Sequence, residues 1–381
     1  MELNYALVHE WLTPKATGGS ELVVQEILRH IDARLYALID FESSNPHSYL
    51  YGRKIGTTFL QQFPRAQEGV QKYLPLLPIA IEQLDLREYD VILSSSHAVA
   101  KGVLTAPHQL HICYCHTPMR YAWDLTWDYL EGDRNGRGFR GLATRYLLHR
   151  LRQWDVISAN RVDCFVANSR HTARRIWRCY RREAEVVYPP VAVERFSALA
   201  NSHQKEDFYL TVCRLVSYKK VELIVRAFNQ LKKNLIVIGS GAQLSQLQEL
   251  ACPNVKLMGW QPQKIVEEYM AKARAFVYAA CEDFGIALVE AQACGTPVIA
   301  YGRGGATETV IDIRENPDLG TGVLFEEQTP ESLVAGVETF ERHRTQISIE
   351  KCCHQAANFS PQVFEKSYLE LVANRTQRFI S

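Results

Sequence analysis

Residues 281–308 read CEDFGIALVEAQACGTPVIAYGRGGATE and begin where a predicted strand ends. An apolar run ends near Ala280, a turn with Glu282 and Gly285 follows, and the pattern predicts a helix from about Ile286. The unpaired backbone N–H groups at a helix start carry partial positive charge and bind anions. The stretch therefore predicts an α/β fold with an anion-binding turn at the end of a strand.

Short apolar runs alternate with helical patterns on both sides of this stretch, which indicates strand-helix units and parallel sheets. The prolines of VVYPPVAVERF and the polar run after them are typical of a domain linker. We therefore predict an N-terminal Rossmann-like domain at 1–190, a C-terminal one at 191–360 and an amphipathic terminal helix at 361–381. Strands are predicted at 5–8, 34–39, 90–94, 111–114, 163–167, 209–212, 235–238, 255–258, 275–278, 298–301 and 323–325.

The composition is that of a soluble globular protein, with 47% hydrophobic and 22% charged residues among 381. The net charge of +1, from 43 basic and 42 acidic residues, argues against a nucleic-acid partner. The ten cysteines contain no CxxC pair, and the opening MELNYALVHEWL lacks the pattern of a signal peptide. No run of about 18 residues is apolar throughout. We therefore expect a reduced, cytoplasmic protein.

Residues 134–182 are strongly basic, with 13 arginines, no lysine and two acids, Asp155 and Asp163. Three interpretations are open. The arginines form a solvated helical face, they attract an anionic membrane surface or a lipid diphosphate, or they bind nucleic acid, for which no recognised module is present. The apolar neighbours that favour peripheral membrane contact are Leu147, Leu148, Ile176 and Trp177.

Two carboxylates accompany the predicted turn, because seven residues separate Glu282 from Glu290. Glu290 lies one helical turn past Ile286 on the same face, so we expect it to point into the pocket of the turn. There a carboxylate suits the two hydroxyls of a ribose, as in dinucleotide sites, while Glu282 lies nearer a reacting sugar. The alternative is a surface turn with two unrelated glutamates.

The segment VCRLVSYKKVELIVRAF places Arg214 at a strand end and Lys219 before a helix. Two cations beside a leaving diphosphate neutralise the charge that develops there. The chain contains no Asp-x-Asp pair, with which metal-dependent sugar-nucleotide enzymes hold their cation, so we expect no metal cofactor. Ordinary pairing of both cations with surface acids is the alternative.

In the first half, ICYCHTPMRYAWD places His116 just past a strand, at the sheet edge where parallel folds bind ligands. Gly18 and Gly19 form a turn that leads into a helix, with Ser20 as the expected N-cap. A histidine satisfied by local backbone bonds and an ordinary glycine turn are the alternatives. We predict no role for His9.

The stretch with Glu282 and Glu290, and the glycines that follow it, resembles the Glu-x7-Glu region of retaining glycosyltransferases of family 4. The resemblance covers most of the C-terminal half and, more thinly, the N-terminal half. It implies the GT-B fold, in which two Rossmann-like domains face each other across a cleft. The C-terminal domain then holds the donor, the N-terminal domain mainly the acceptor, and the terminal helix at 361–381 is expected to cross back to the N-terminal domain. The donor-side residues that it implies are Arg214, Lys219, Gly241, Gly259, Trp260, Phe284, Gly285, Ile286 and Glu290.

The resemblance also implies that His116 reaches the donor sugar and that the turn with Gly18 and Gly19 approaches the diphosphate and the acceptor. Lys220 stands where the family usually has glycine, which leaves Lys219 as the better candidate for a phosphate ligand.

A metal-independent retaining glycosyltransferase, which moves a sugar from a nucleotide diphosphate to a saccharide or a lipid-diphosphate-linked acceptor, is the function implied. VHEWL, YCHTPMRYAWD and RLVSYKK look like bacterial exopolysaccharide and O-antigen transferases, so we predict UDP-glucose as donor, with GDP-mannose as the alternative. Heterocyst envelope polysaccharide synthesis is a further expectation, with no separate motif behind it.

Two mechanisms of retention are open. In front-face substitution the departing phosphate takes the acceptor proton, with Glu282 binding sugar hydroxyls and His116 supporting the oxocarbenium charge; in the other, Glu282 forms a covalent intermediate. We prefer the first. Two other functions also remain open, a sugar-nucleotide epimerase or hydrolase on the same scaffold and a catalytically idle scaffold protein.

Overall fold

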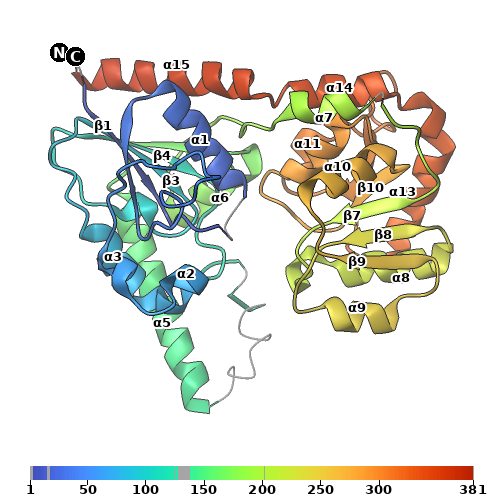
Figure 1. Ribbon diagram of the computed structural model, residues 1–381, viewed down its shortest axis with the longest axis horizontal. Helices are drawn as coiled ribbons and strands as arrows, with labels where there is room; N and C mark the ends of the chain where they lie inside the picture. The colour runs from blue at the N-terminus through green and yellow to red at the C-terminus, as the bar shows by residue number, and fades with distance from the viewer. Residues whose placement is uncertain (1–2, 15–17, 125, 128–137, 201, 381) are drawn as a thin grey trace. The chain divides into compact units, whose positions relative to one another are not determined.

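The chain forms two compact units in the computed structural model, which describes residues 3–14, 18–124, 126–127, 138–200 and 202–380. Unit 1 comprises Met1–Pro190 together with Phe364–Ser381, and unit 2 comprises Val191–Val363. Each unit has its own sheet and its own hydrophobic core (Figure 1). The end of the chain therefore belongs to the first unit.

Unit 1 is built on a parallel sheet in the order β2-β1-β3-β4-β5-β6 within the described residues. Its strands are β1 (Tyr5–His9), β2 (Ala33–Ala37), β3 (Val91–Ser96), β4 (Leu110–Cys115), β5 (Cys164–Ala167) and β6 (Ala184–Val186). Its helices are α1 (Gly19–His30), α2 (Ala66–Gly69), α3 (Leu77–Glu82), α5 (Gly138–Ala159), α6 (Arg170–Tyr180) and most of α15 (Pro361–Ile380).

Helices cover both faces of this sheet because successive strand residues point to opposite sides. Ala6 and Val8 share a core with α3 and α5, whereas Leu7 packs with α1 and α15. Figure 1 shows α15 and α1 on one side of the sheet and α3 and α5 on the other. The central strands β3 and β4 are accordingly buried along their whole length.

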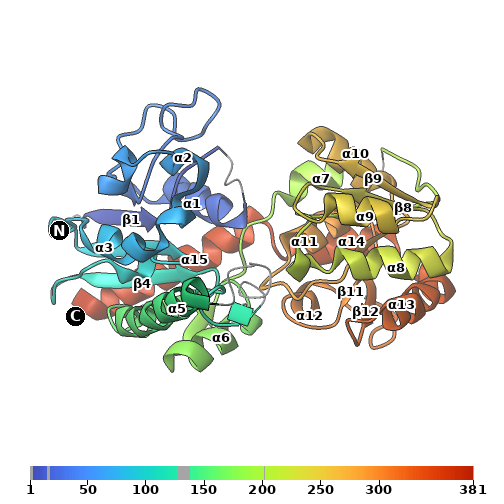
Figure 2. The same cartoon turned by 90° about the horizontal axis from the view of Figure 1, so that it is seen from below.

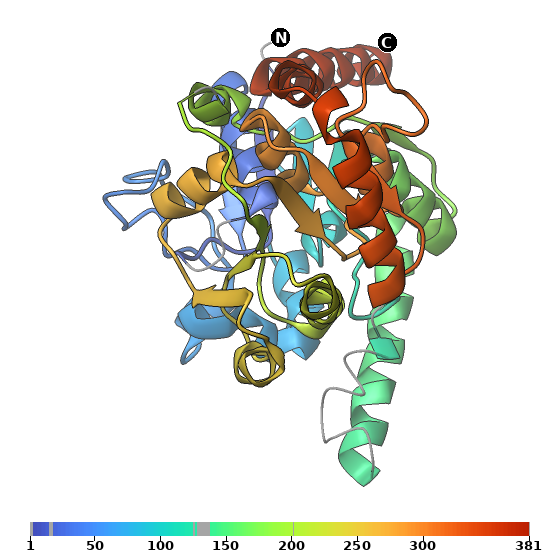
Figure 3. The ribbon, with the colours of Figure 1, turned by 90° about the vertical axis from the view of Figure 1, so that its right-hand side faces the viewer.

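Unit 2 repeats this architecture with a parallel sheet in the order β12-β11-β10-β7-β8-β9. Helices α8 and α13 lie side by side on one face (Figures 2 and 3), while α7, α11 and α14 pack together. The strands are β7 (Tyr209–Val212), β8 (Leu235–Ile238), β9 (Val255–Gly259), β10 (Ala275–Tyr278), β11 (Val298–Tyr301) and β12 (Gly322–Phe325). The helices are α7 (Val193–Ala200), α8 (Val221–Leu231), α9 (Leu244–Leu250), α10 (Gln263–Lys272), α11 (Ile286–Ala293), α12 (Ala306–Thr309), α13 (Pro330–His343) and α14 (Ile349–Ala357).

Each sheet has a point at which the direction of strand addition reverses. In unit 1 the chain goes from β1 outward to β2 and then returns to β3 on the other side of β1. In unit 2 it runs β7, β8, β9 and then returns to β10 beside β7. Ligands of open α/β sheets bind beyond the carboxyl ends of the strands at such switch points. The ends of β1, β3, β7 and β10 are therefore where a site is expected.

The predicted α/β class is confirmed, and the predicted strands of unit 2 agree with the observed ones to within one residue. In unit 1 the strand predicted at 34–39 ends at Ala37, because Leu38 pairs with the loop carbonyl of Glu10 instead. The short strand β6 was not predicted. Ser20 is not the N-cap of α1: the helix begins at Gly19, Gly18 is the cap, and the Ser20 hydroxyl donates to Glu21.

Among the described residues, no helix combines the length and the apolar character needed to cross a membrane.

Candidate active site

Three side chains meet at the switch point of the unit 2 sheet. Lys219, in the short 3-10 turn Ser217–Lys219 after β7, donates to the Tyr278 hydroxyl at 3.0 Å and forms an ion pair with Glu282. Tyr278 is the last residue of β10, and its hydroxyl donates to the same Glu282 oxygen at 2.7 Å. The ends of two neighbouring strands thus bring together a cation, a carboxylate and a phenol.

The surroundings of Tyr278 keep its hydroxyl protonated. Burial, followed by the negative charge of Glu282, raises the pKa of Tyr278 well above its usual value. The Lys219 ammonium lies 5.6 Å from the Tyr278 ring centroid and 5.5 Å from that of Tyr218, within the range of cation–π attraction. Lys219 and Glu282 retain side-chain exposures of 14% and 17%, so both charges remain accessible.

In the turn before α11 the N-cap position is a glycine, Gly285, which has no side chain that could cap the helix start. Gly285, the N-cap, has φ 92°, a left-handed conformation that suits glycine. A second loop supports the turn: the Gly305 N–H donates to the Glu282 carbonyl at 2.8 Å, and a Cβ at Gly304 would lie 2.2 Å from that oxygen. Only glycine permits this approach, which holds the start of α11 in place.

Two further loops follow β8 and β9 along the same sheet edge. A Cβ at Gly241 would lie 2.3 Å from the Leu215 carbonyl oxygen, so this loop packs directly against the segment that follows β7. The Gly239 N–H donates to the Gly259 carbonyl at 2.8 Å, and Gly259 has open space on its Cβ side. Trp260 follows with 71% of its surface exposed.

The remaining predicted donor-side residues have separate contacts. Arg214 is exposed and donates to the Tyr218 hydroxyl at 3.0 Å rather than to Glu282. Glu290 lies near Glu267 of α10 and Arg195 of α7. Burial, with a contribution from Glu267, raises the pKa of Glu290 to about 7 while Arg195 opposes the shift. Phe284 is buried, and Ile286 is the first residue of α11.

In unit 1, His116 directly follows β4, and its Nε2 lies 2.8 Å from the Ser95 hydroxyl. Ser95 also contacts Nδ1 of His9, the last residue of β1, at 3.1 Å. Rings of His9 and His116 both neighbour His97, whose centroid is 6.2 and 6.4 Å from theirs. These residues gather at the switch point of this sheet, as Lys219 and Glu282 do in unit 2.

The Glu21 carboxylate contacts both the glycine turn before α1 and His9 of the histidine cluster. One Glu21 oxygen accepts from the Gly18 N–H at 2.9 Å, and the other lies 3.8 Å from Nε2 of His9. Burial acts to raise the pKa of Glu21, but the contacts with His9 and Ser20 outweigh it and lower the pKa to about 2. Gly19 is the first residue of the helix.

Sequence reasoning missed Tyr278, Ser95, His9 and Glu21. A signal existed for three of them: His9 and Ser95 stand at strand ends, and Glu21 three residues after Gly18 matches a capping box. Tyr278 ends an apolar run and gave no sign of its polar role.

Many of the basic residues at 134–182 that the structure describes serve the fold. Arg175 pairs with Asp124 at 2.5 Å, and Arg161 pairs with Glu82 at 2.6 Å. Of the apolar neighbours, Ile176 is fully buried, while Trp177 is 54% exposed and stacks with Arg181 at 4.3 Å. Residues 134–137 lie outside the described residues.

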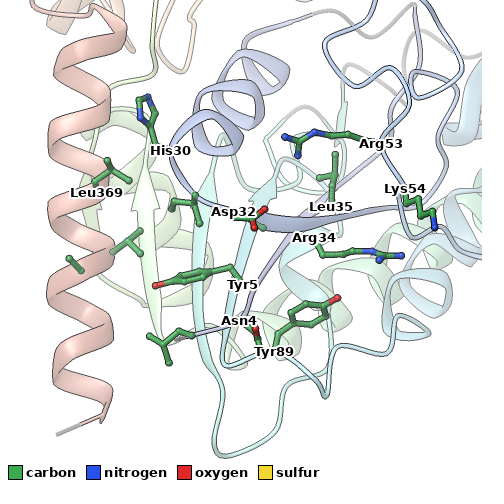
Figure 4. Close-up of a pocket in the computed structure, with 15 residues that line it drawn as sticks. Asn4, Tyr5, His30, Asp32, Arg34, Leu35, Arg53, Lys54, Tyr89 and Leu369 are labelled. Carbon is green, nitrogen blue, oxygen red and sulfur yellow. The ribbon is translucent and has the colours of Figure 1, made fainter. Parts of the chain in front are cut away.

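A cavity of about 960 Å³ lies at the opposite edge of the unit 1 sheet, at the amino ends of β1 and β2. Figure 4 shows Tyr5, Asp32 and Arg34 around it, with Leu369 of α15 at its side. It is remote from His9 and His116, which lie at the carboxyl ends, so its volume does not identify the site. No group of three or more His, Cys, Asp or Glu side chains suited to a metal ion occurs among the residues described.

Comparison with known proteins identifies the family. Residues 193–358 match Glycosyl transferases group 1, and residues 17–195 match Glycosyltransferase Family 4. The chain is 24% identical over 347 residues to the alpha-1,3/1,6-mannosyltransferase ALG2 of Kluyveromyces lactis, covering 74% of this chain and 65% of that one. It is 36% identical over 113 residues to a GDP-mannose-dependent monoacylated alpha-(1-6)-phosphatidylinositol monomannoside mannosyltransferase of Corynebacterium glutamicum, covering 26% and 30%.

The first curated relatives are matched over less than half of their own length. Among solved structures, Anabaena HepE in complex with UDP superposes with a TM-score of 0.67 at 17% identity, covering 97% of this chain and 100% of that one. This likeness concerns the fold. The two family matches together run from residue 17 to residue 358, and the chain belongs to the family-4-like glycosyltransferases with the GT-B fold.

Proposed function

We propose that this protein is a hexosyltransferase that takes its sugar from a nucleotide diphosphate bound in unit 2. The observation that carries the proposal is the meeting of Lys219, Tyr278 and Glu282 at the switch point of the sheet. The start of α11, whose N-cap residue is Gly285, follows Glu282 by four residues. A diphosphate needs fixed positive charge and N–H donors, and a sugar needs a carboxylate for its hydroxyls; this edge supplies all three.

In this proposal Lys219 and Arg214 bind the diphosphate together with the N–H groups at Gly285 and Ile286. The loops at Gly241 and Gly259 border the phosphate and the base, with Trp260 as an exposed aromatic beside the base. Glu290 binds the ribose hydroxyls. Phe284 is buried and holds the turn in shape.

The ion pair between Lys219 and Glu282 suits a site that binds an anion and a sugar together. The Lys219 ammonium and the Glu282 carboxylate neutralise each other, and both side chains are only partly exposed. A diphosphate competes with Glu282 for the Lys219 ammonium, and the freed carboxylate then accepts from sugar hydroxyls. Tyr278, held protonated, donates to Glu282 and keeps it oriented.

We propose that catalysis is metal-independent, since Lys219, Arg214 and the start of α11 supply positive charge where the leaving diphosphate develops negative charge. Transfer with retention is proposed to proceed by front-face substitution, with Glu282 binding the sugar and His116 supporting the oxocarbenium charge. A glycosyl adduct on Glu282, detected by mass spectrometry of the intact protein, would replace this route by the covalent one.

For the donor we propose UDP-glucose, and for the acceptor a growing exopolysaccharide or a lipid-linked saccharide, heterocyst envelope polysaccharide included. HepE, which shares the fold, has been solved with UDP-glucose. The two mannosyltransferases to which the chain is similar make GDP-mannose the second candidate.

Calorimetric titration with UDP, GDP, UDP-glucose and GDP-mannose tests the donor, and mass analysis of products from labelled donor tests the reaction. Tighter binding of UDP than of GDP and a new glycoside are expected. Binding of neither nucleotide contradicts the proposal. Free sugar as the sole product with every acceptor tried, or conversion to an epimer, assigns the alternative hydrolase or epimerase function.

We also propose peripheral contact of α6 with an anionic membrane, because Trp177, Arg174 and Arg178 are exposed on it. Flotation with vesicles containing anionic phospholipid is expected to carry the wild type and to carry Trp177→Ala less well. Equal recovery on neutral vesicles contradicts the contact.

A further inference from the structure

The Ser95 hydroxyl lies between two histidine rings at the carboxyl edge of the unit 1 sheet. It is 2.8 Å from Nε2 of His116 and 3.1 Å from Nδ1 of His9. Parallel pairing in register places His9 of β1 beside Ser95 of β3, and His116 follows β4, the next strand. His9 and Ser95 are fully buried, so the strands themselves determine these distances.

The backbone indicates that Nδ1 of His9 carries a hydrogen. Nδ1 of His9 lies 3.3 Å from the Ser95 carbonyl oxygen as well as near the Ser95 hydroxyl. A carbonyl oxygen can only accept, so Nδ1 of His9 is the donor in this contact. The Ser95 hydroxyl is placed to accept from the same N–H, which leaves its own single hydrogen available for Nε2 of His116.

We infer that His9 and Ser95 are positioning residues that hold His116 in one tautomer, with the ring hydrogen on Nδ1. A neutral imidazole that accepts at Nε2 carries its hydrogen on Nδ1. The contact at Nε2 then fixes the orientation of the His116 ring for its proposed role. The inference rests on the proposed role of His116 in glycosyl transfer and adds how that residue is prepared for it.

Glu21 anchors the other end of this chain of contacts. Its carboxylate lies 3.8 Å from Nε2 of His9, a buried nitrogen without a hydrogen bond among the described residues. The same carboxylate accepts from the Gly18 N–H and the Ser20 hydroxyl, each at 2.9 Å. Glu21 therefore contacts both the glycine turn and His9.

The same sheet contains a matched control. Ser94, the neighbour of Ser95 in β3, is buried, and its hydroxyl lies 2.8 Å from Nε2 of His111. Because adjacent strand residues point to opposite faces, this pair lies on the other side of the sheet from Ser95. Ser94→Ala thus removes a serine–histidine contact of the same length that has no part in the proposal.

Long-range ¹H–¹⁵N correlation spectra of the protein labelled in histidine nitrogen test the tautomer without any turnover. We expect His116, assigned by its loss in His116→Gln, to show a pyridine-like Nε2 and a protonated Nδ1, and Ser95→Ala to change this pattern while Ser94→Ala does not. A protonated Nε2 of His116 in the wild type would overturn the inference.

Kinetics then separate positioning from folding. Ser95→Ala should lower kcat about tenfold, the worth of one hydrogen bond, with little change in KM for the donor. Ser95→Thr, which keeps the hydroxyl, and His9→Asn, which keeps a donor near the Nδ1 position, should recover most of kcat, unlike His9→Phe. Equal kcat in Ser95→Ala and Ser94→Ala would contradict the inference. Absence of any sugar transfer by wild-type protein with the expected tautomer would refute the proposed function instead.

Discussion

Burial brings the pKa of the Glu290 carboxyl group close to neutral pH. Its pKa is raised to about 7 by burial, with Glu267 adding to the rise and Arg195 opposing it. A carboxyl whose pKa is raised by folding contributes stability below the pKa of the unfolded chain, and that contribution is lost as the pH rises through the folded pKa. Glu290 therefore stabilises unit 2 at pH 5 relative to pH 8.

Replacing Glu290 by Gln removes this titration. Glu290→Gln should raise the free energy of unfolding at pH 8 by on the order of 2 kcal/mol and flatten its fall between pH 5 and pH 8. Urea denaturation at several pH values measures this. Glu338→Gln, an exposed carboxyl on α13, should keep the wild-type slope. An unchanged slope in Glu290→Gln would contradict the raised pKa.

Single residues could be predicted where their position followed from a strand end. Glu282 and Lys219 were predicted from two separate segments, as ligands of the sugar and of the diphosphate, and the structure joins them in an ion pair. Tyr278 was not predicted, because its contacts depend on the pairing of β10 with β7, which no local pattern shows. The same holds for Ser95, whose two histidine contacts come from strands far apart in sequence.

At the scale of elements, the start of α11 depends on the loop 302–305. Gly304, with φ 69°, lies so close that an added Cβ would stand 2.2 Å from the Glu282 carbonyl. Gly52 has a similar φ of 74°, but a Cβ there meets open space. Alanine substitutions at the two glycines therefore distinguish two destabilising effects. Both variants have a left-handed alanine, but only the one at Gly304 also has a steric clash.

Gly52→Ala should cost about 1 kcal/mol of stability, the penalty of a left-handed residue. Gly304→Ala should cost more than this and should also weaken UDP binding, since the turn that carries Glu282 must move. Thermal unfolding and calorimetry on both variants measure the difference. Equal effects would mean that the loop does not support the turn.

Periodicity predicted most elements because buried parallel strands are continuous apolar runs. It failed for β6 (AEV), an edge strand of three residues without such a run. The N-cap of α1 was also misplaced, because serine is in general a good N-cap. In the structure the Glu21 carboxylate accepts from the Gly18 N–H, and Gly18 is the N-cap.

At the scale of the whole molecule, each unit has its own sheet and core, so nucleotide binding should protect one unit selectively. Hydrogen exchange with UDP should slow at residues 214–220, 239–241 and 285–287, all in unit 2. The amides of β6 in unit 1 serve as an internal reference. Protection confined to unit 1 would place the nucleotide elsewhere.

In the proposed function, Lys219 and the start of α11 bind the diphosphate. Titration of UDP into variants of two neighbouring lysines, with and without a chelator, tests this most directly. Lys219→Met should weaken UDP binding about 10- to 100-fold, the worth of a charge-assisted hydrogen bond of roughly 1.5–3 kcal/mol. Lys220→Met, which removes the exposed neighbour, should bind as the wild type does, and the chelator should change neither. Equal weakening by both substitutions, or loss of wild-type binding with chelator, would contradict the account.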